Sequence, residues 1–260
     1  MTEPDFPPPP APVQVKRRFS PLLAIFLVLA VAGVVLAITG VLTVFSYRTV
    51  SIRSGSMSSA VAPGSAAIYG LRGGQEIHRG DVVVFEADVF PGAPHGKFMQ
   101  RVIAVGGDEI RCCDLDKRII VNGKPVAEPY LDPAVSPADA AVPFEAKVPP
   151  GTVFVAGDTR NNSFDSRMVV QPYALETGSV PLSKVDGVVV ATGSFFWPET
   201  VKPTTAFTDA GLSGASTEDT GPVSSRLTAT GGAALFLLGF VGAIVTAVRR
   251  RKAAAAPPRH

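Results

Sequence analysis

The sequence predicts a mainly β domain outside a membrane, flanked by two transmembrane α-helices. The chain of 260 residues is 46% hydrophobic and only 18% charged, which makes it more apolar than a typical soluble protein. Two apolar stretches without charged residues account for the excess, and each is long enough to cross a hydrocarbon core of about 30 Å. Between them lie short apolar, β-branched runs separated by glycine, proline and asparagine, a pattern typical of strands joined by turns.

The first transmembrane helix is predicted over residues 19–47. No charged residue occurs between Arg18 and Arg48, and residues 22–45 are rich in Leu, Val, Ala and Ile. A cleavable signal peptide would have a shorter apolar region of about 7 to 15 residues, so we expect an uncleaved anchor. Residues 1–18 include consecutive prolines at 7–10 and are predicted to be a disordered cytoplasmic tail.

The second transmembrane helix is predicted over residues 227–248, and residues 249–260 form a basic tail. Basic clusters lie at 16–18 before the first helix and at 249–252 after the second, and such clusters stay on the cytoplasmic side. We therefore expect a two-pass plasma-membrane protein with both termini cytoplasmic and residues 48–197 extracytoplasmic. Residues 198–226 are rich in Thr, Ser, Gly, Asp and Pro and are predicted to be a flexible linker.

Charge and composition restrict the expected partners. The net charge is only +2 and the basic residues concentrate beside the helices, which indicates contact with the lipid bilayer and argues against nucleic acid. We expect neither a metal nor a cofactor, because no His, Cys and Asp cluster has ligand spacing and no glycine-rich phosphate loop opens a helix. The two cysteines, Cys112 and Cys113, are adjacent, so a pair in a β-hairpin, a redox role and an intermolecular bridge all remain open.

The domain between the helices is predicted to be all-β. The runs expected to form strands are 66–69, 81–85, 98–105, 119–121, 152–156 and 185–192. Towards the end of this region, the segment from Gly157 to Arg167 contains two aspartates, two arginines and two serines directly after a strand. From composition alone this segment could be a polar loop held together by ion pairs.

Residues 54–57, with the sequence Ser-Gly-Ser-Met, lie about nine residues beyond the first apolar stretch. A serine held just outside a membrane anchor suggests a nucleophile that meets membrane-bound substrates at the bilayer surface. Taken together with the segment from Gly157 to Arg167, this motif favours membrane-tethered proteolysis.

Four stretches of the chain resemble type I signal peptidases, the S26 family of serine proteases. They are residues 54–57, residues 79–85 (RGDVVVF), residues 101–110 (RVIAVGGDEI) and residues 157–167 (GDTRNNSFDSR). The resemblance covers the anchor and roughly residues 51–190, and the Cys-Cys-Asp run resembles versions from high-GC Gram-positive bacteria. It implies a domain of strongly curved β-sheets, which removes signal peptides from exported proteins after small residues.

The resemblance also implies a role for each site residue. Ser56 would be the attacking serine, and its backbone N–H together with the hydroxyl of Ser54 would form the oxyanion hole. Ser163 would orient a general base, and Asp165 would pair with Arg101 or Arg167. These two arginines, Asp158 and Asp165 would support the shape of the site.

At the position of the family's general-base lysine this chain has Gln100. A glutamine amide donates and accepts hydrogen bonds but does not act as a base near neutral pH. Lys97 and His95 are candidate substitutes, although Lys97 should face away from Gln100 because side chains alternate along a strand. His78 and Lys147 are further candidates, and for each of these four an exposed structural role is the competing interpretation.

Three hypotheses remain open at this point. The first is an active signal peptidase that uses an unidentified base or a water relay through Gln100. The second is a catalytically impaired relative that binds exported segments or partners without cutting them. The third is a structural membrane protein whose serines are incidental.

Overall fold

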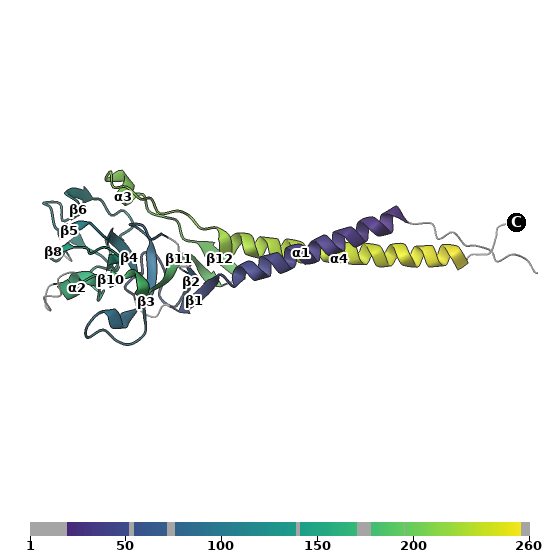
Figure 1. Ribbon diagram of the computed structural model, residues 1–260, viewed down its shortest axis with the longest axis horizontal. Helices are drawn as coiled ribbons and strands as arrows, with labels where there is room; N and C mark the ends of the chain where they lie inside the picture. The colour runs from purple at the N-terminus through teal and green to yellow at the C-terminus, as the bar shows by residue number, and fades with distance from the viewer. Residues whose placement is uncertain are drawn as a thin grey trace, which may run out of the picture. The chain divides into compact units, whose positions relative to one another are not determined.

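The computed structural model describes residues 20–51, 55–71, 76–138, 141–170, 178–194 and 196–255 (Figure 1). The chain divides into two compact units, one made of residues 1–36 with 231–260 and the other of residues 37–230. Two long helices, α1 (Pro21–Val44) and α4 (Gly221–Ala255), each contribute residues to both units. Both are long and apolar enough to be candidate membrane spans, over Pro21–Val44 and Gly221–Ala253.

In the first unit the two helices approach closely through small residues. A Cβ atom added at Gly33 would lie 2.3 Å from the backbone nitrogen of Phe236, and one added at Gly239 would lie 2.5 Å from that of Ala30. Only glycine allows such approach, which is the way helices associate in lipid, where apolar burial gives no driving force. Leucine, valine and isoleucine side chains along both helices are exposed, as expected of surfaces that face lipid.

The second unit is mainly β, as predicted. In the described residues one sheet has the order β1-β2-β11-β3-β4-β9-β10, with β12 paired to β11, and a smaller sheet has the order β7-β6-β5-β8. All strand pairs are antiparallel, and each of the six predicted runs coincides with a strand. The large sheet comprises β1 (Tyr47–Ser51), β2 (Ala66–Leu71), β3 (Val82–Glu86), β4 (Lys97–Val105), β9 (Thr152–Ala156), β10 (Val180–Pro181), β11 (Val185–Ser194) and β12 (Trp197–Thr200).

The smaller sheet comprises β5 (Glu109–Cys112), β6 (Ile119–Val121), β7 (Lys124–Val126) and β8 (Phe144–Lys147). Short helical turns complete the unit: η1 (Ala87–Val89), α2 (Ser166–Val170), η3 (Leu182–Lys184) and α3 (Ala206–Asp209). The long strand β4 is buried along most of its length, and its two faces pack into different clusters. Val102 packs with Phe85 of β3 and with Phe90, which follows η1, whereas Met99 packs with Met57 and Val82.

The segment predicted to be a flexible linker over residues 198–226 is instead partly built into the domain. Phe207 and Leu212 are buried in the core cluster that includes Phe144 and Phe154, and strand β12 pairs with β11. Arg79 Nη1 donates a hydrogen bond of 2.6 Å to the carbonyl of Ser213. The average composition of this segment is polar and therefore gives no sign of Phe207 and Leu212, the two apolar residues that attach it to the core.

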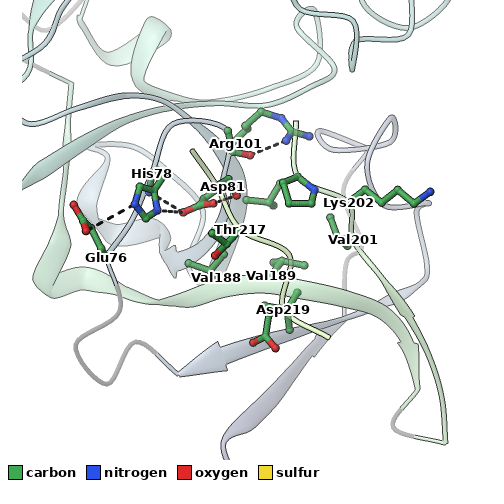
Figure 2. Close-up of a pocket in the computed structure, with 15 residues that line it drawn as sticks. Glu76, His78, Asp81, Arg101, Val188, Val189, Val201, Lys202, Thr217 and Asp219 are labelled. Atoms are coloured by element: carbon green, nitrogen blue, oxygen red, sulfur yellow. Dashed lines mark hydrogen bonds and ion pairs between the residues drawn. The ribbon is translucent and has the colours of Figure 1, made fainter. Parts of the chain in front are cut away.

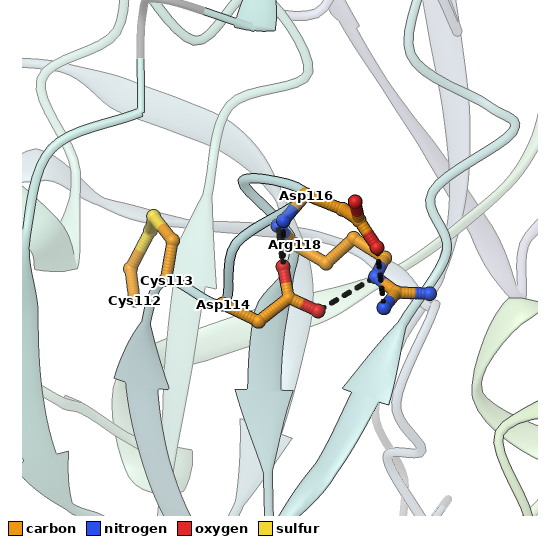
Figure 3. The surroundings of a disulfide bond; sticks show 5 residues. All are labelled: Cys112, Cys113, Asp114, Asp116 and Arg118. Carbon is orange, nitrogen blue, oxygen red and sulfur yellow. Dashed lines mark hydrogen bonds and ion pairs between the residues drawn. A yellow bond between two sulfur atoms is a disulfide. The ribbon is translucent and has the colours of Figure 1, made fainter.

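Cys112 and Cys113 form a disulfide at the end of β5 (Figure 3). The pair lies in the hairpin between β5 and β6, where Cys112 is opposite Ile119. Within the connecting turn, Asp114 accepts hydrogen bonds from the backbone N–H of Arg118 at 2.8 Å and from its Nε at 2.7 Å (Figure 3). The cysteines thus pair within one hairpin, and neither is available for an intermolecular bridge in this state.

Candidate active site

The loop that carries Ser56 is attached to the segment that follows β9. The backbone N–H of Thr159 donates to the carbonyl of Ser56 at 2.8 Å, and the Thr159 hydroxyl donates to the carbonyl of Gly55 at 2.7 Å. Ser58 Oγ lies 2.7 Å from the same hydroxyl. Two motifs about a hundred residues apart in the sequence therefore form one site, with Ser56 half-buried within it.

The side chain of Met57 anchors the loop in the hydrophobic core. Its side chain is fully buried beside Val61 and Met99, and the backbone N–H of Asp158 lies 3.3 Å from its sulfur atom. The backbone N–H groups of Ala60 and Val61 both donate to the Met57 carbonyl, which closes a tight turn after Ser56. A buried side chain directly after the serine holds the serine backbone in one position.

Because Gly157 has no side chain, Ser163 and the Ser56 backbone can both lie against it. A Cβ atom at residue 157 would lie 2.2 Å from Ser163 Oγ and 2.8 Å from the Ser56 carbonyl oxygen. Both groups therefore rest against the bare Cα of Gly157. The structure therefore places Ser163 close to the Ser56 backbone.

A buried ion pair shapes the segment around Ser163. Arg167 donates to Asp165 through Nε at 2.9 Å and Nη2 at 2.7 Å, and the backbone N–H of Gly157 donates to the same carboxylate at 3.0 Å. Asp165 is completely buried and also accepts the backbone N–H of Arg167 at the start of α2. Of the two partners expected for Asp165, the structure selects Arg167.

Arg101 pairs with Asp158 instead. Its Nε and Nη2 atoms lie 2.9 and 2.7 Å from the two carboxylate oxygens, its Nη1 donates to the Gly80 carbonyl, and its guanidinium stacks on Tyr130 at 4.2 Å. Bidentate pairs of this kind fix both partners in a single geometry. Since Arg101 follows Gln100 on β4, this pair also fixes the strand at the position of the family's base.

Gln100 is 2% exposed and lies on the face of β4 that it shares with Val102. Its Nε2 donates a hydrogen bond of 2.6 Å to the carbonyl of Phe164, the neighbour of Ser163. Among the described residues, Gln100 Oε1 and Ser163 Oγ are buried oxygens without a hydrogen-bond partner. A buried polar atom without a partner is costly, so these two atoms indicate where a further polar group would be bound.

Lys97 is held away from Gln100 by two carboxylates. Its Nζ lies 2.8 Å from Glu86 and close to Asp186, and its side chain is 35% exposed. Burial alone would lower the pKa of Lys97, but the two carboxylates outweigh it and raise the pKa well above the ordinary value. The amine stays charged at neutral pH, which disfavours Lys97 as a general base.

The other substitutes lie in exposed or separate positions. His95 is exposed, and Lys147 pairs with Glu109 at 3.0 Å on the smaller sheet with 77% of its side chain exposed. His78 lines a small cavity of about 30 Å³ beside β3, where it faces Asp81 and Glu76 (Figure 2). Burial raises the pKa of Asp81 there, and the residues described around this cavity include neither Ser56 nor Gln100.

Ser54, expected to complete the oxyanion hole, lies outside the described residues. Thr159 makes the principal contacts with the serine loop, yet sequence reasoning did not single it out. The only available signal was its place between Asp158 and Arg160 in a conspicuous motif.

Comparison with known proteins places this arrangement in a family. The family described as "Signal peptidase, peptidase S26" matches residues 23–194, well over half of the chain. The chain belongs to the S26 signal peptidase family. This membership confirms the resemblance drawn from the four sequence motifs, and the family relationship agrees with the mainly β fold.

Individual S26 relatives are similar over parts of their length. Signal peptidase I of Mycobacterium tuberculosis H37Rv is 41% identical over 99 residues, which cover 34% of this chain and 33% of that protein. Signal peptidase I of Pseudomonas fluorescens is 29% identical over 205 residues, which cover 64% of this chain and 70% of that protein. The crystal structure of a signal peptidase I from Enterococcus faecalis V583 is 26% identical with a TM-score of 0.36 and covers 44% of this chain and 97% of that one. The chain therefore spans about a third of the length of the mycobacterial relative that it matches.

Proposed function

We propose that this chain is a membrane-anchored signal peptidase I, a serine endopeptidase that removes signal peptides from exported proteins after small residues. Ser56 is the proposed nucleophile, with its own N–H and the Ser54 hydroxyl as oxyanion donors. The observation that supports this proposal best is the attachment of the Ser56 loop to residues 157–159, with Ser163 beside the serine backbone. A preorganised oxyanion donor is typically worth about 3 kcal/mol of transition-state stabilisation.

The proposed reaction proceeds through an acyl-enzyme. Ser56 Oγ attacks the carbonyl carbon of the scissile peptide bond, the new amine leaves with a proton, and water then hydrolyses the ester to regenerate the serine. Gln100 cannot itself take the serine proton. We propose that Gln100 Oε1 and Ser163 Oγ, the two unpartnered buried oxygens, position a water that relays it.

The direct experiment is cleavage of a precursor with a signal peptide by the purified full-length chain in detergent. Ser56→Ala should reduce cleavage by about four to six decades, as for loss of a nucleophile in other serine proteases. Ser59→Ala is a matched control in the same loop, because Ser59 Oγ makes only a 3.3 Å contact with the backbone N–H of Asp132. Unchanged cleavage by the Ser56→Ala enzyme would refute the assignment.

A second candidate is a catalytically impaired relative that binds exported segments without cutting them. The buried amide of Gln100 at the position of the family's base favours it. This candidate predicts that the wild-type chain turns over very slowly and that Gln100→Lys raises cleavage sharply. Robust wild-type turnover rules it out, whereas labelling of Ser56 by an active-serine probe excludes a purely structural role.

The proposed topology has α1 and α4 as membrane spans, both termini in the cytoplasm and the β domain outside. The basic residues at 16–18 and 249–252 support this orientation. Protease added outside intact spheroplasts should digest the β domain and leave tags at both termini protected. Digestion of either terminal tag would refute the two-pass arrangement.

A further inference from the structure

The connection between β7 and β8 takes part in the candidate site. It runs from residue 127 to residue 143, and connections longer than about 12 residues without secondary structure of their own are uncommon and often carry function. Its residues 128–136 lie against residues 158–160, which follow β9. None of them belongs to the four stretches that resemble the family, so the sequence motifs leave this loop without a role.

Two side chains attach the loop to the site through buried arginines. The guanidinium of Arg101 stacks on the ring of Tyr130 at 4.2 Å. Glu128 accepts hydrogen bonds from the Tyr130 hydroxyl and, at 2.6 Å, from Nη2 of Arg160. The side chains of Arg160 and Glu128 are 7% and 10% exposed, and a charge pair out of water is only weakly screened. The loop is therefore fixed to Asp158 through Arg101 and to Arg160 directly.

A third side chain of the loop, Ser136, bonds to the backbone of residues 158–160. Its hydroxyl donates to the carbonyl of Asp158 and accepts the backbone N–H of Arg160 at 2.7 Å. Ser136 is 8% exposed, so no bulk water stands ready to replace either bond. A hydroxyl has one proton to donate and lone pairs to accept with, and Ser136 uses both kinds of group on the backbone that flanks Thr159.

The two ends of one peptide group connect Ser136 to Ser56. The carbonyl of Asp158 and the N–H of Thr159 belong to the same peptide unit, which is planar, so they can only rotate together. The carbonyl end is held by the Ser136 hydroxyl, whereas the N–H end donates to the carbonyl of Ser56 at 2.8 Å. Ser136 thereby sets the direction of the hydrogen bond that fixes the backbone of Ser56.

We propose that Ser136 is a positioning residue for the nucleophile, which it holds in place through the peptide group between Asp158 and Thr159. The inference rests on the proposed function of Ser56. Without the Ser136 hydroxyl this peptide group is free to rotate, while the Thr159 hydroxyl still holds the carbonyl of Gly55. The loop that carries Ser56 then stays attached but is less well placed, so the loss falls on kcat rather than on KM.

The first test is steady-state cleavage of a precursor by the purified full-length chain in detergent. We expect Ser136→Ala to lower kcat by about 10- to 100-fold, with KM changed by less than about twofold. Ser136→Thr keeps the hydroxyl and should recover most of the loss. Ser225→Ala, at another buried serine whose hydroxyl bonds only within α4, is the matched control and should keep the wild-type kcat. A wild-type kcat in Ser136→Ala, or a loss confined to KM, would overturn the proposal.

The second test is backbone amide exchange, measured in the Ser56→Ala chain so that it does not depend on cleavage. We expect Ser136→Ala to speed exchange at the Thr159 N–H several-fold, while the Val102 N–H, which donates to the carbonyl of Asp81, keeps its rate. Equal acceleration at both amides would mean that Ser136 supports the fold as a whole and would overturn the proposal. If the wild-type chain cleaves no precursor, the proposed function fails, and the exchange result alone decides whether Ser136 positions the backbone of residue 56.

Discussion

Gly157→Ala tests whether the site depends on close contact between Ser163 and the backbone of Ser56. The added Cβ would lie 2.2 Å from Ser163 Oγ, whereas ordinary contact begins at 3.4 Å, so the hydroxyl must move by about 1.2 Å. The Ser56 carbonyl, 2.8 Å away, is backbone and cannot rotate aside. Overpacking of this kind costs about 1 to 3 kcal/mol of folding free energy. Misplacement of reacting groups by about 1 Å can cost roughly 100-fold in rate.

The assay is steady-state cleavage of a precursor protein, together with urea unfolding of the same preparations. We expect Gly157→Ala to remain folded but to lose about 100-fold in kcat, because the serine and its neighbour are displaced. Gly55→Ala is the matched control in the same loop, since its Cβ would meet only Asn162 Nδ2 at an ordinary 3.7 Å. If both variants cleave equally well, the contact at Gly157 does not position the nucleophile and the reasoning is wrong.

Three further predictions concern charge and packing. Burial alone would raise the pKa of Asp108, but hydrogen bonds from Arg79, Val105 N–H and Asn122 outweigh it and lower the pKa. The stability that this carboxylate contributes is present above its ordinary pKa and is lost as the pH falls through the lowered value. Asp108→Asn should therefore lower the free energy of unfolding in urea by about 3 kcal/mol at neutral pH and weaken its decline at acid pH. An unchanged decline at acid pH would contradict this prediction. Lys97→Ala should leave precursor cleavage unchanged and alter stability by less than about 1 kcal/mol, whereas loss of cleavage would identify Lys97 as the base. Phe207→Ala should cost about 3 to 5 kcal/mol in urea unfolding, with exposed Thr208→Ala as the neutral control; equal effects would mean that the segment after β12 does not pack in the core.

The strands could be predicted from the sequence where their apolar residues form unbroken runs. The run that became β9 contains Val-Phe-Val-Ala, the run that became β4 ends in Val-Ile-Ala-Val, and each is covered on both faces. The strand β8 was not predicted, because its sequence Phe-Glu-Ala-Lys has only two apolar residues among charged ones. It forms because Phe144 and Ala146 pack into the core and because β5 provides a pairing edge. Such pairing depends on distant parts of the chain and leaves little local signal.

The structure brings together residues of two motifs that the sequence analysis named, but the pairing of their charged side chains could not be predicted. Ser56, Ser163, Asp158 and Asp165 were identified from their motifs. Which arginine pairs with which aspartate depends on how β4 and β9 are registered, and Arg101 lies opposite Ala156, two residues before Asp158. The same register brings the Gln100 side chain within hydrogen-bond distance of the Phe164 carbonyl, a contact that no local sequence pattern predicts.

The disulfide at the end of β5 joins two consecutive residues and so encloses no other part of the chain. A disulfide stabilises a fold mainly by reducing the conformational entropy of the unfolded chain, and the effect grows with the length of the loop that the bridge closes. A bridge between neighbouring residues closes no loop of this kind. Its two sulfur atoms belong to the only cysteines of the sequence, so no alternative pairing exists within one molecule. The domain must therefore obtain its stability from its apolar clusters and buried ion pairs, and its unfolding should respond little to a reducing agent. A chain built in this way needs no oxidoreductase to choose among disulfide partners.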